Sequence, residues 1–94
     1  MACSLADRVA PAPDVLVRLL GDEAVVVNLE GGLYFGLDAI GARIWALSAA
    51  HDLGGVAEAL TREFDVDRAR AEADVLDFVS QLMDRGLLIR VSRD

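Results

Sequence analysis

The chain has 94 residues, enough for one domain with a single hydrophobic core and too few for two. Hydrophobic residues make up 54% of it, so the core needs neither disulfides nor a structural metal. Its 16 acidic residues outnumber its 9 basic residues, all of them Arg, and the net charge of −7 disfavours a nucleic-acid backbone as a partner.

The sequence lacks the residue sets that catalysis and metal binding need. One cysteine, Cys3, and one histidine, His51, supply neither a supported nucleophile nor a zinc cluster. The glycine pairs at 31–32 and 54–55 are not followed by the Lys-Ser/Thr of a phosphate-binding loop. We therefore expect a protein that is not an enzyme and that holds no cofactor and no metal.

The first 13 residues predict a flexible N-terminal arm, which ends at Pro11 and Pro13. Asp7 and Arg8 interrupt any apolar run there, which argues against a signal peptide. No apolar stretch approaches the roughly 20 residues of a membrane span. These features predict a cytoplasmic protein with one folded domain over residues 14–94.

Three short strands follow the arm. Residues 15–20, 24–29 and 33–37 are rich in β-branched, aromatic and other apolar side chains. The segments between them, 21–23 and 30–32, contain glycine and acidic residues that favour turns. Because turns this short join antiparallel neighbours, we expect a three-stranded antiparallel meander.

Helical periodicity begins at Asp38, whose carboxylate can accept hydrogen bonds from the first turn of a helix. The spacing of apolar residues predicts helices over 38–49, 53–64 and 67–85, and Gly86 is suited to end the third. Residues 87–91 form an apolar tail that is either a strand or an extended segment on the core. The fold class is thus α+β, a three-stranded sheet followed by three helices.

The third predicted helix carries more apolar surface than one buried face requires. One row of apolar residues contains Ala69, Ala73, Leu76, Val79 and Met83. A second row, displaced by about a third of a turn, contains Ala71, Val75, Phe78 and Leu82 and is bordered by Asp74, Gln81 and Arg85. Either both rows pack internally, or the second row lines an exposed groove for a partner.

The third predicted strand suits a binding role because Tyr34 and Phe35 point to opposite faces. If this strand lies at the edge of its sheet, its free N–H and C=O groups can pair with an extended peptide. The strand and the second row together predict a peptide-binding groove.

The order of strands and helices, together with several segments, resembles the PqqD-like family of peptide chaperones, also called RiPP recognition elements. The segments that carry the resemblance are NLEGGLYFGL (28–37), GARIW (41–45), ADV (73–75) and GLL (86–88). The resemblance covers about residues 14–91 and is strongest to the leader-binding proteins of lasso-peptide biosynthesis.

This resemblance implies a winged-helix-like domain that binds the leader segment of a ribosomally made precursor peptide and delivers it to a processing enzyme, in lasso pathways a leader peptidase. The leader would add as a strand to the third strand and lie against the third helix. The implied peptide-binding residues are Leu33, Tyr34, Phe35 and Gly36 on the strand and Ala71, Asp74, Val75, Phe78 and Leu82 on the helix.

Two alternatives remain open from the sequence. A three-helix domain with a small sheet is also the architecture of winged-helix DNA-binding proteins, in which the third helix enters the major groove. The acidic character of the third helix opposes this reading. The other alternative is a structural adaptor that docks onto an enzyme, which differs from a recognition element only in whether it binds an isolated leader peptide.

Overall fold

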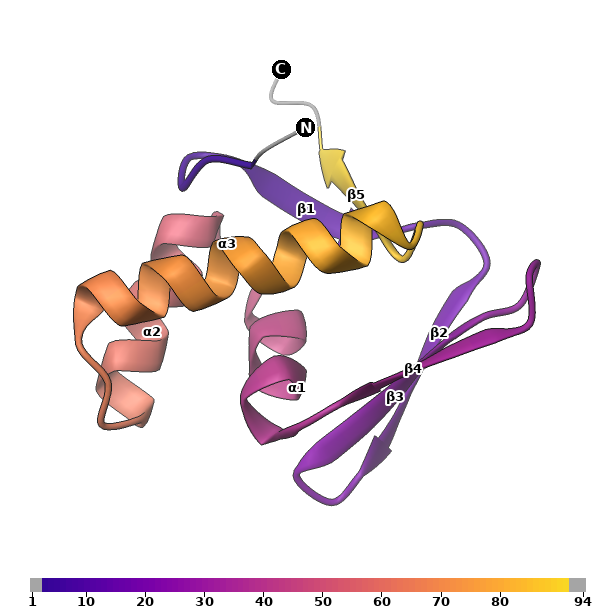
Figure 1. The fold of residues 1–94 in the computed structure, drawn as a ribbon, viewed down its shortest axis with the longest axis horizontal. Coiled ribbons are helices and arrows are strands. Elements are labelled where there is room, and N and C mark those ends of the chain that lie inside the picture. Colours follow the sequence, from indigo (N-terminus) through magenta and orange to yellow (C-terminus); the bar gives the residue numbers. More distant parts are fainter. Residues whose placement is uncertain (1–2, 92–94) are drawn as a thin grey trace.

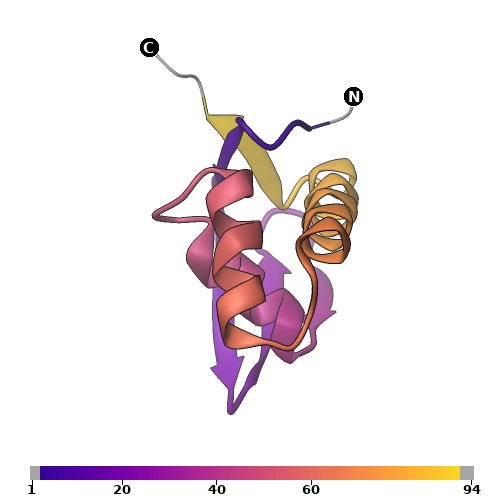
Figure 2. The same cartoon turned by 90° about the vertical axis from the view of Figure 1, so that its left-hand side faces the viewer.

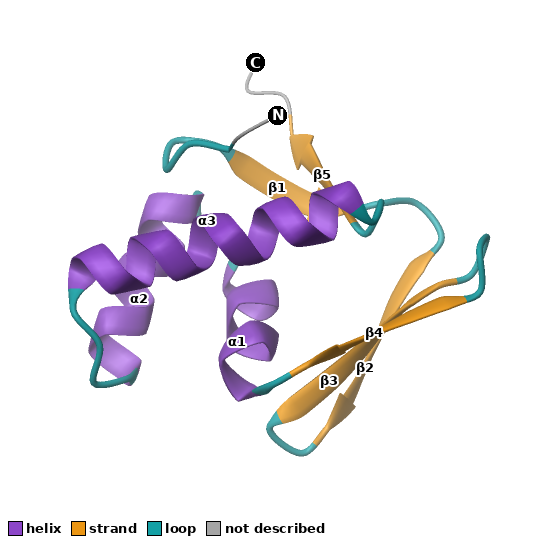
Figure 3. Cartoon of the chain, viewed as in Figure 1, coloured by secondary structure: helices purple, strands orange, loops and turns teal. Residues whose placement is uncertain are grey.

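The computed structural model describes residues 3–91, which form five strands and three helices (Figures 1 and 3). The elements are β1 (Arg8–Pro11), β2 (Val15–Leu20), β3 (Glu23–Asn28), β4 (Leu33–Leu37), α1 (Ala39–Leu47), α2 (Leu53–Glu63), α3 (Arg68–Asp84) and β5 (Leu88–Val91). The predicted α+β class is confirmed. Each of the six predicted elements lies within two residues of an observed one at both ends.

Two separate sheets flank the helices. Strands β2, β3 and β4 form the predicted antiparallel meander in that order, and Figure 1 shows it extending away from the helices at the lower right. Glycines at positive φ make the turns between these strands, Gly21 at 68° and Gly32 at 71°, a region that side chains disfavour. Strand β4 leads directly into α1 through Asp38.

An aspartate caps the N-terminus of each helix. The side chains of Asp38, Asp52 and Asp67 accept hydrogen bonds from backbone N–H groups three residues later. The third helix ends in a Schellman motif, in which Gly86 N–H bonds Met83 C=O at 3.0 Å and Leu87 N–H bonds Leu82 C=O at 2.9 Å. With φ at +75°, Gly86 fills the position that the sequence predicts for it.

The N-terminal segment differs from the predicted flexible arm. Residues 8–11 form β1, which pairs antiparallel with β5, so both ends of the described chain meet at the top of Figure 1. Val9 and Cys3 are buried, and Cys3 Sγ lies 3.1 Å from Met83 Sδ. The two prolines had suggested an irregular arm. Strand β1 tolerates Pro11 because it lies at the edge of its sheet, where an N–H is not needed for pairing. Residues 1–2 of the predicted arm and 92–94 of the predicted domain lie outside the described residues.

A single core joins both sheets to the helices. Figure 2 shows α2 and α3 lying side by side, with α2 in front of the meander. Buried side chains of these helices belong to one cluster with those of β3 and α1. The largest fully buried side chains are Ile44, Leu53, Leu82, Val26, Val56, Val75 and Val79. Within residues 3–91, no helix is long and apolar enough to cross a bilayer.

Candidate functional site: an open strand edge beside α3

Strand β4 lies at the edge of the meander. It pairs with β3 on one side, and no strand among residues 3–91 pairs with its other side. An unpaired edge exposes backbone donors and acceptors that an extended chain can use. The condition set by the sequence reading, that the third strand is an edge, is therefore met.

The hydrogen-bond pattern identifies the open groups on β4. Leu29 N–H bonds Asp14 C=O at 2.8 Å, so the odd-numbered residues of β3 bond towards β2. Because bonding directions alternate along a strand, the even-numbered residues of β3 bond towards β4, where they face residues 33, 35 and 37. The N–H and C=O groups of Tyr34 and Gly36 therefore point to the open edge.

The two faces of β4 have different environments. Phe35 lies opposite the buried Val26 and packs half-buried against the core. Tyr34 lies on the other face of the sheet and is 76% exposed, and Leu33 at the start of the strand is 63% exposed. The strand thus combines one anchored aromatic ring with apolar side chains that have no cover within the described chain.

A hollow of about 250 Å³ lies between the start of α1 and the middle of α3. Its lining comes from Asp38, Ile40, Gly41 and Ile44 on one side and Asp74, Asp77, Phe78 and Gln81 on the other. Phe78 packs tightly on α1, since a Cβ at Gly41 would lie 2.9 Å from its ring. Glycine at position 41 therefore lets Phe78 form the floor of this hollow.

A second hollow, of about 350 Å³, lies at the other end of β4. Leu33, Tyr34 and Phe35 line it from the strand, and Arg85 and Leu87 line it from the end of α3 and the segment that follows. The Arg85 guanidinium lies 4.7 Å from the centre of the Phe35 ring, a cation–π contact that connects helix and strand.

One stripe of α3 lines these hollows. It contains Asp74, Asp77, Phe78, Gln81 and Arg85. These positions recur at three- and four-residue intervals, which places them on one side of a helix. We call the space between this stripe and the open edge of β4 the β4–α3 groove.

Three predicted binding residues are not part of this groove. Ala71, Val75 and Leu82 are buried in the core, at 1%, 0% and 0% exposure, so they cannot contact a partner in this structure. The prediction that the second apolar row of α3 lines an exposed groove was wrong, because most of that row packs into the core. In the first row, Ala69 and Ala73 are exposed instead.

The remaining predicted residues lie where a partner can reach them. Leu33, Tyr34, Gly36 and Asp74 are exposed, and Phe35 and Phe78 are half-buried. The sequence reading assigned no binding role to Asp77, Gln81, Ile40 or Leu87, which also line the two hollows. Asp74 and Arg85, which the sequence offered as candidates for a charge contact with the peptide, line one hollow each. The signal for Gln81 was present, since it borders the second row at helical spacing.

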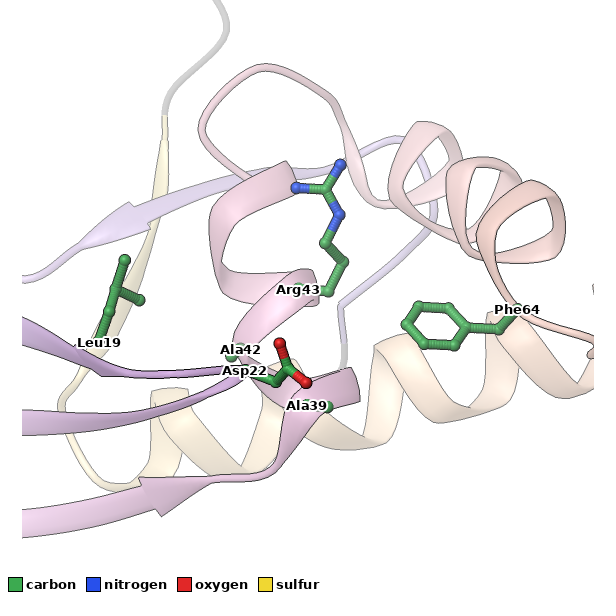
Figure 4. A pocket seen from close by; sticks show the side chains of 6 residues that line it. All are labelled: Leu19, Asp22, Ala39, Ala42, Arg43 and Phe64. Atoms are coloured by element: carbon green, nitrogen blue, oxygen red, sulfur yellow. The ribbon is translucent and has the colours of Figure 1, made fainter.

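Another hollow lies on the opposite side of the meander, near the β2–β3 turn (Figure 4). It is lined by Leu19, Asp22, Ala39, Ala42, Arg43 and Phe64. Arg43 donates two hydrogen bonds to the Glu63 carboxylate, at 2.6 and 2.8 Å, and these lower the pKa of that carboxyl from its ordinary value of 4.5. The guanidinium that lines this hollow is therefore already paired with a carboxylate.

Comparison with known proteins places this geometry in a family. Residues 23–88 match the family described as Coenzyme PQQ synthesis protein D (PqqD). No curated protein matches the chain. A solved structure described as "TbiB1 in Complex with the TbiA(beta) Leader Peptide" is 34% identical, with a TM-score of 0.79 over 88% of this chain and 98% of that one.

A second solved structure, "Lasso peptide synthetase B1 complexed with the leader peptide", is 28% identical, with a TM-score of 0.79 over 87% of this chain and 98% of that one. Both structures agree with the resemblance to lasso-peptide leader-binding proteins that the sequence suggested. Since the family match spans most of the chain, the protein belongs to the PqqD family, whose members are also called RiPP recognition elements.

Proposed function

We propose that this protein binds the leader segment of a ribosomally made precursor peptide by adding it as a strand to β4, within the β4–α3 groove. The observation that carries the proposal is the open edge at Tyr34 and Gly36 beside the side-chain stripe of α3. Strand addition supplies affinity through backbone hydrogen bonds, and flanking pockets supply specificity through side chains.

The groove offers enough free energy for this role. The N–H and C=O groups of Tyr34 and Gly36 allow four strand hydrogen bonds, worth about 1 kcal/mol each. Two apolar side chains of the leader, packed near Phe35 and Phe78, add about 2 kcal/mol each. Ordering a disordered leader costs about 2–5 kcal/mol. The remainder of roughly 3–6 kcal/mol corresponds to a Kd between several millimolar and tens of micromolar.

The solved relatives support the identity of the partner. Both were determined with a leader peptide bound, and both share the fold over nearly their whole length. We extend that partner to this chain because its β4 edge is open and its groove carries apolar side chains for anchoring.

The protein delivers the bound precursor to a separate processing enzyme, a leader peptidase of a lasso-peptide pathway, in the cytoplasm and without a catalytic step of its own. Adding the protein to that peptidase and its precursor should accelerate leader cleavage, and the protein alone should leave the precursor intact. Cleavage by the protein alone would contradict the non-catalytic role.

Amide hydrogen exchange of the full chain, with and without the leader peptide of its precursor, tests the binding mode. Binding should slow exchange at the Tyr34 and Gly36 amides, which gain partners. The Val17 amide, which by the same alternation points to the open edge of β2, is the internal control. Leader binding that protects Val17 and leaves Tyr34 and Gly36 unchanged would reject β4 as the site.

The DNA-binding alternative gains no support from α3. Two of its arginines are already bonded to carboxylates, Arg68 to Glu72 at 2.7 Å and Arg70 to Asp74 at 3.2 Å. Neutralising phosphates requires free cations. A gel shift with duplex DNA at low salt should therefore show no retention, and robust binding would favour the DNA-binding alternative.

A further inference from the structure

The two ends of the β4–α3 groove carry opposite charge. At the end near α1, the lining includes Asp38, Asp74 and Asp77. At the end near Leu33, the charged side chain of the lining is Arg85. A peptide bound along β4 would therefore meet a different charge at each end.

The acidic end remains negative after its internal bonds are counted. Asp38 accepts from Gly41 N–H at 2.8 Å and offsets the positive N-terminus of α1. Asp74 is paired with Arg70 at 3.2 Å. Asp77 accepts from the neutral Gln81 amide at 2.9 Å, and within residues 3–91 it has no cationic partner. Asp77 is thus the carboxylate left to bind a cation.

The basic end is similarly available. Arg85 has no carboxylate partner within residues 3–91, and its guanidinium lies over the face of the Phe35 ring. That contact holds the guanidinium over the groove without neutralising it. Guanidinium groups bind carboxylates in a planar, two-bonded geometry.

Spacing relates the two charges to a bound strand. Asp77 and Arg85 are eight residues apart on α3, a rise of about 12 Å. A strand covers that distance in about four residues, and residues four apart in a strand share one face. In the bound peptide, the residue midway between these two also shares that face and would lie near Phe35 and Phe78.

We propose, building on the proposed function, that the groove selects a leader with a basic residue, an apolar residue two positions later and an acidic residue two positions after that. The basic residue binds Asp77 and the acidic residue binds Arg85. This order follows from antiparallel pairing, the more stable arrangement, in which the N-terminal half of the guest lies beside Leu37.

A displayed library of extended peptides, randomised over about nine positions, tests this selection on the full chain. Enriched peptides should carry Lys or Arg four positions before Asp or Glu, with an apolar residue between them. Enrichment without this charge order, or with the reverse order, overturns the inference and leaves peptide binding intact. Failure of any peptide to bind overturns the proposed function and this inference together.

Charge reversal tests the assignment to individual residues. In Arg85→Glu, an enriched peptide should lose about fivefold in affinity, and exchanging its acidic residue for Lys should restore binding. Asp77→Lys should give the same result for the basic residue. The matched controls are Arg8→Glu on β1 and Asp65→Lys in the α2–α3 loop, which make the same changes in net charge.

The reversal experiment either supports or overturns the inference. Rescue by the exchanged peptide, seen only with the groove variants and weakened at high salt, supports the inference, since exposed charges are screened. Equal losses in the groove and control variants would show that net charge alone acts, and would overturn it. Circular dichroism establishes that each variant is folded.

Discussion

The meander has two open edges, and their surroundings differ. Strands β2 and β4 both pair with β3 on one side and with no other strand among residues 3–91. Beside β4, the α3 stripe offers the ring of Phe78 and the charges of Asp77 and Arg85, which have no oppositely charged partner within residues 3–91. Beside β2, the charged side chains Arg43 and Glu63 bind each other.

The comparison teaches that an open edge alone does not define a site. Exposed apolar residues are even more frequent on β2, where Leu16, Val17, Leu19 and Leu20 are all exposed, Leu19 at 71%. A strand added there would gain hydrogen bonds but no helix wall with free charges.

The largest effect concerns the layer beneath the β4–α3 groove. Val75 is fully buried, so Val75→Asp places a carboxylate in the core without a partner and should destabilise the fold by about 3–5 kcal/mol. That is a large part of the stability of a small domain. Urea unfolding measures it, with Asp77→Asn, two residues away on the exposed side, as the control. A stable Val75→Asp variant would mean that this row is not core.

The next effect separates the two edges directly. Gly36→Pro removes an outward N–H from β4, and its ring blocks the incoming strand, so leader binding should fall about 30-fold or more. A Cβ at Gly36 would meet no atom within 4 Å, and proline is tolerated on an edge strand where the N–H points outward, so the variant should fold.

Val17→Pro is the matched change on β2, where the N–H also points outward by the same alternation. Calorimetric titration with the leader should show wild-type affinity for this variant. A larger loss in Val17→Pro than in Gly36→Pro would assign the peptide to β2.

A smaller effect compares the aromatic rings of the two hollows. Phe78 and Phe64 are both half-buried, and they line the hollows near β4 and β2 respectively. Phe78→Ala should weaken leader binding about tenfold, because a partly buried ring contributes somewhat less than 2 kcal/mol. Phe64→Ala should leave the affinity unchanged while lowering stability. Fluorescence anisotropy with a labelled leader measures both, and equal affinities would exclude Phe78 as an anchor.

The sequence predicted the parts of the fold that local chemistry determines. The cap at Asp38, the glycine turns and the helix end at Gly86 each depend on a few neighbouring residues, and all three are confirmed. The exposed edge followed from the order of three strands joined by short turns. These features need no information about distant contacts.

The sequence could not determine which side of α3 faces the core. Both apolar rows satisfy helical periodicity, and the choice between them depends on how α3 packs on the rest of the chain. Part of the first row is covered by the N-terminal segment, where Cys3 meets Met83. Because 80 residues separate that pair, no local pattern indicates the contact. The same long-range packing leaves Asp77 and Arg85 facing the groove.

The smallest effect concerns the ion pair beside β2. Arg43→Gln removes both hydrogen bonds to Glu63 and should leave leader affinity unchanged, because neither residue lines the β4–α3 groove. Because the pKa of Glu63 is lowered by folding, the pair stabilises the fold at pH values above 4.5, the ordinary pKa of a glutamate. This contribution is lost as the pH falls through the lowered pKa of Glu63. Thermal unfolding should therefore show a small difference between wild type and variant at pH 7 that disappears in acid. A difference that grows in acid would contradict this assignment, and a loss of leader binding would extend the site to the β2 side.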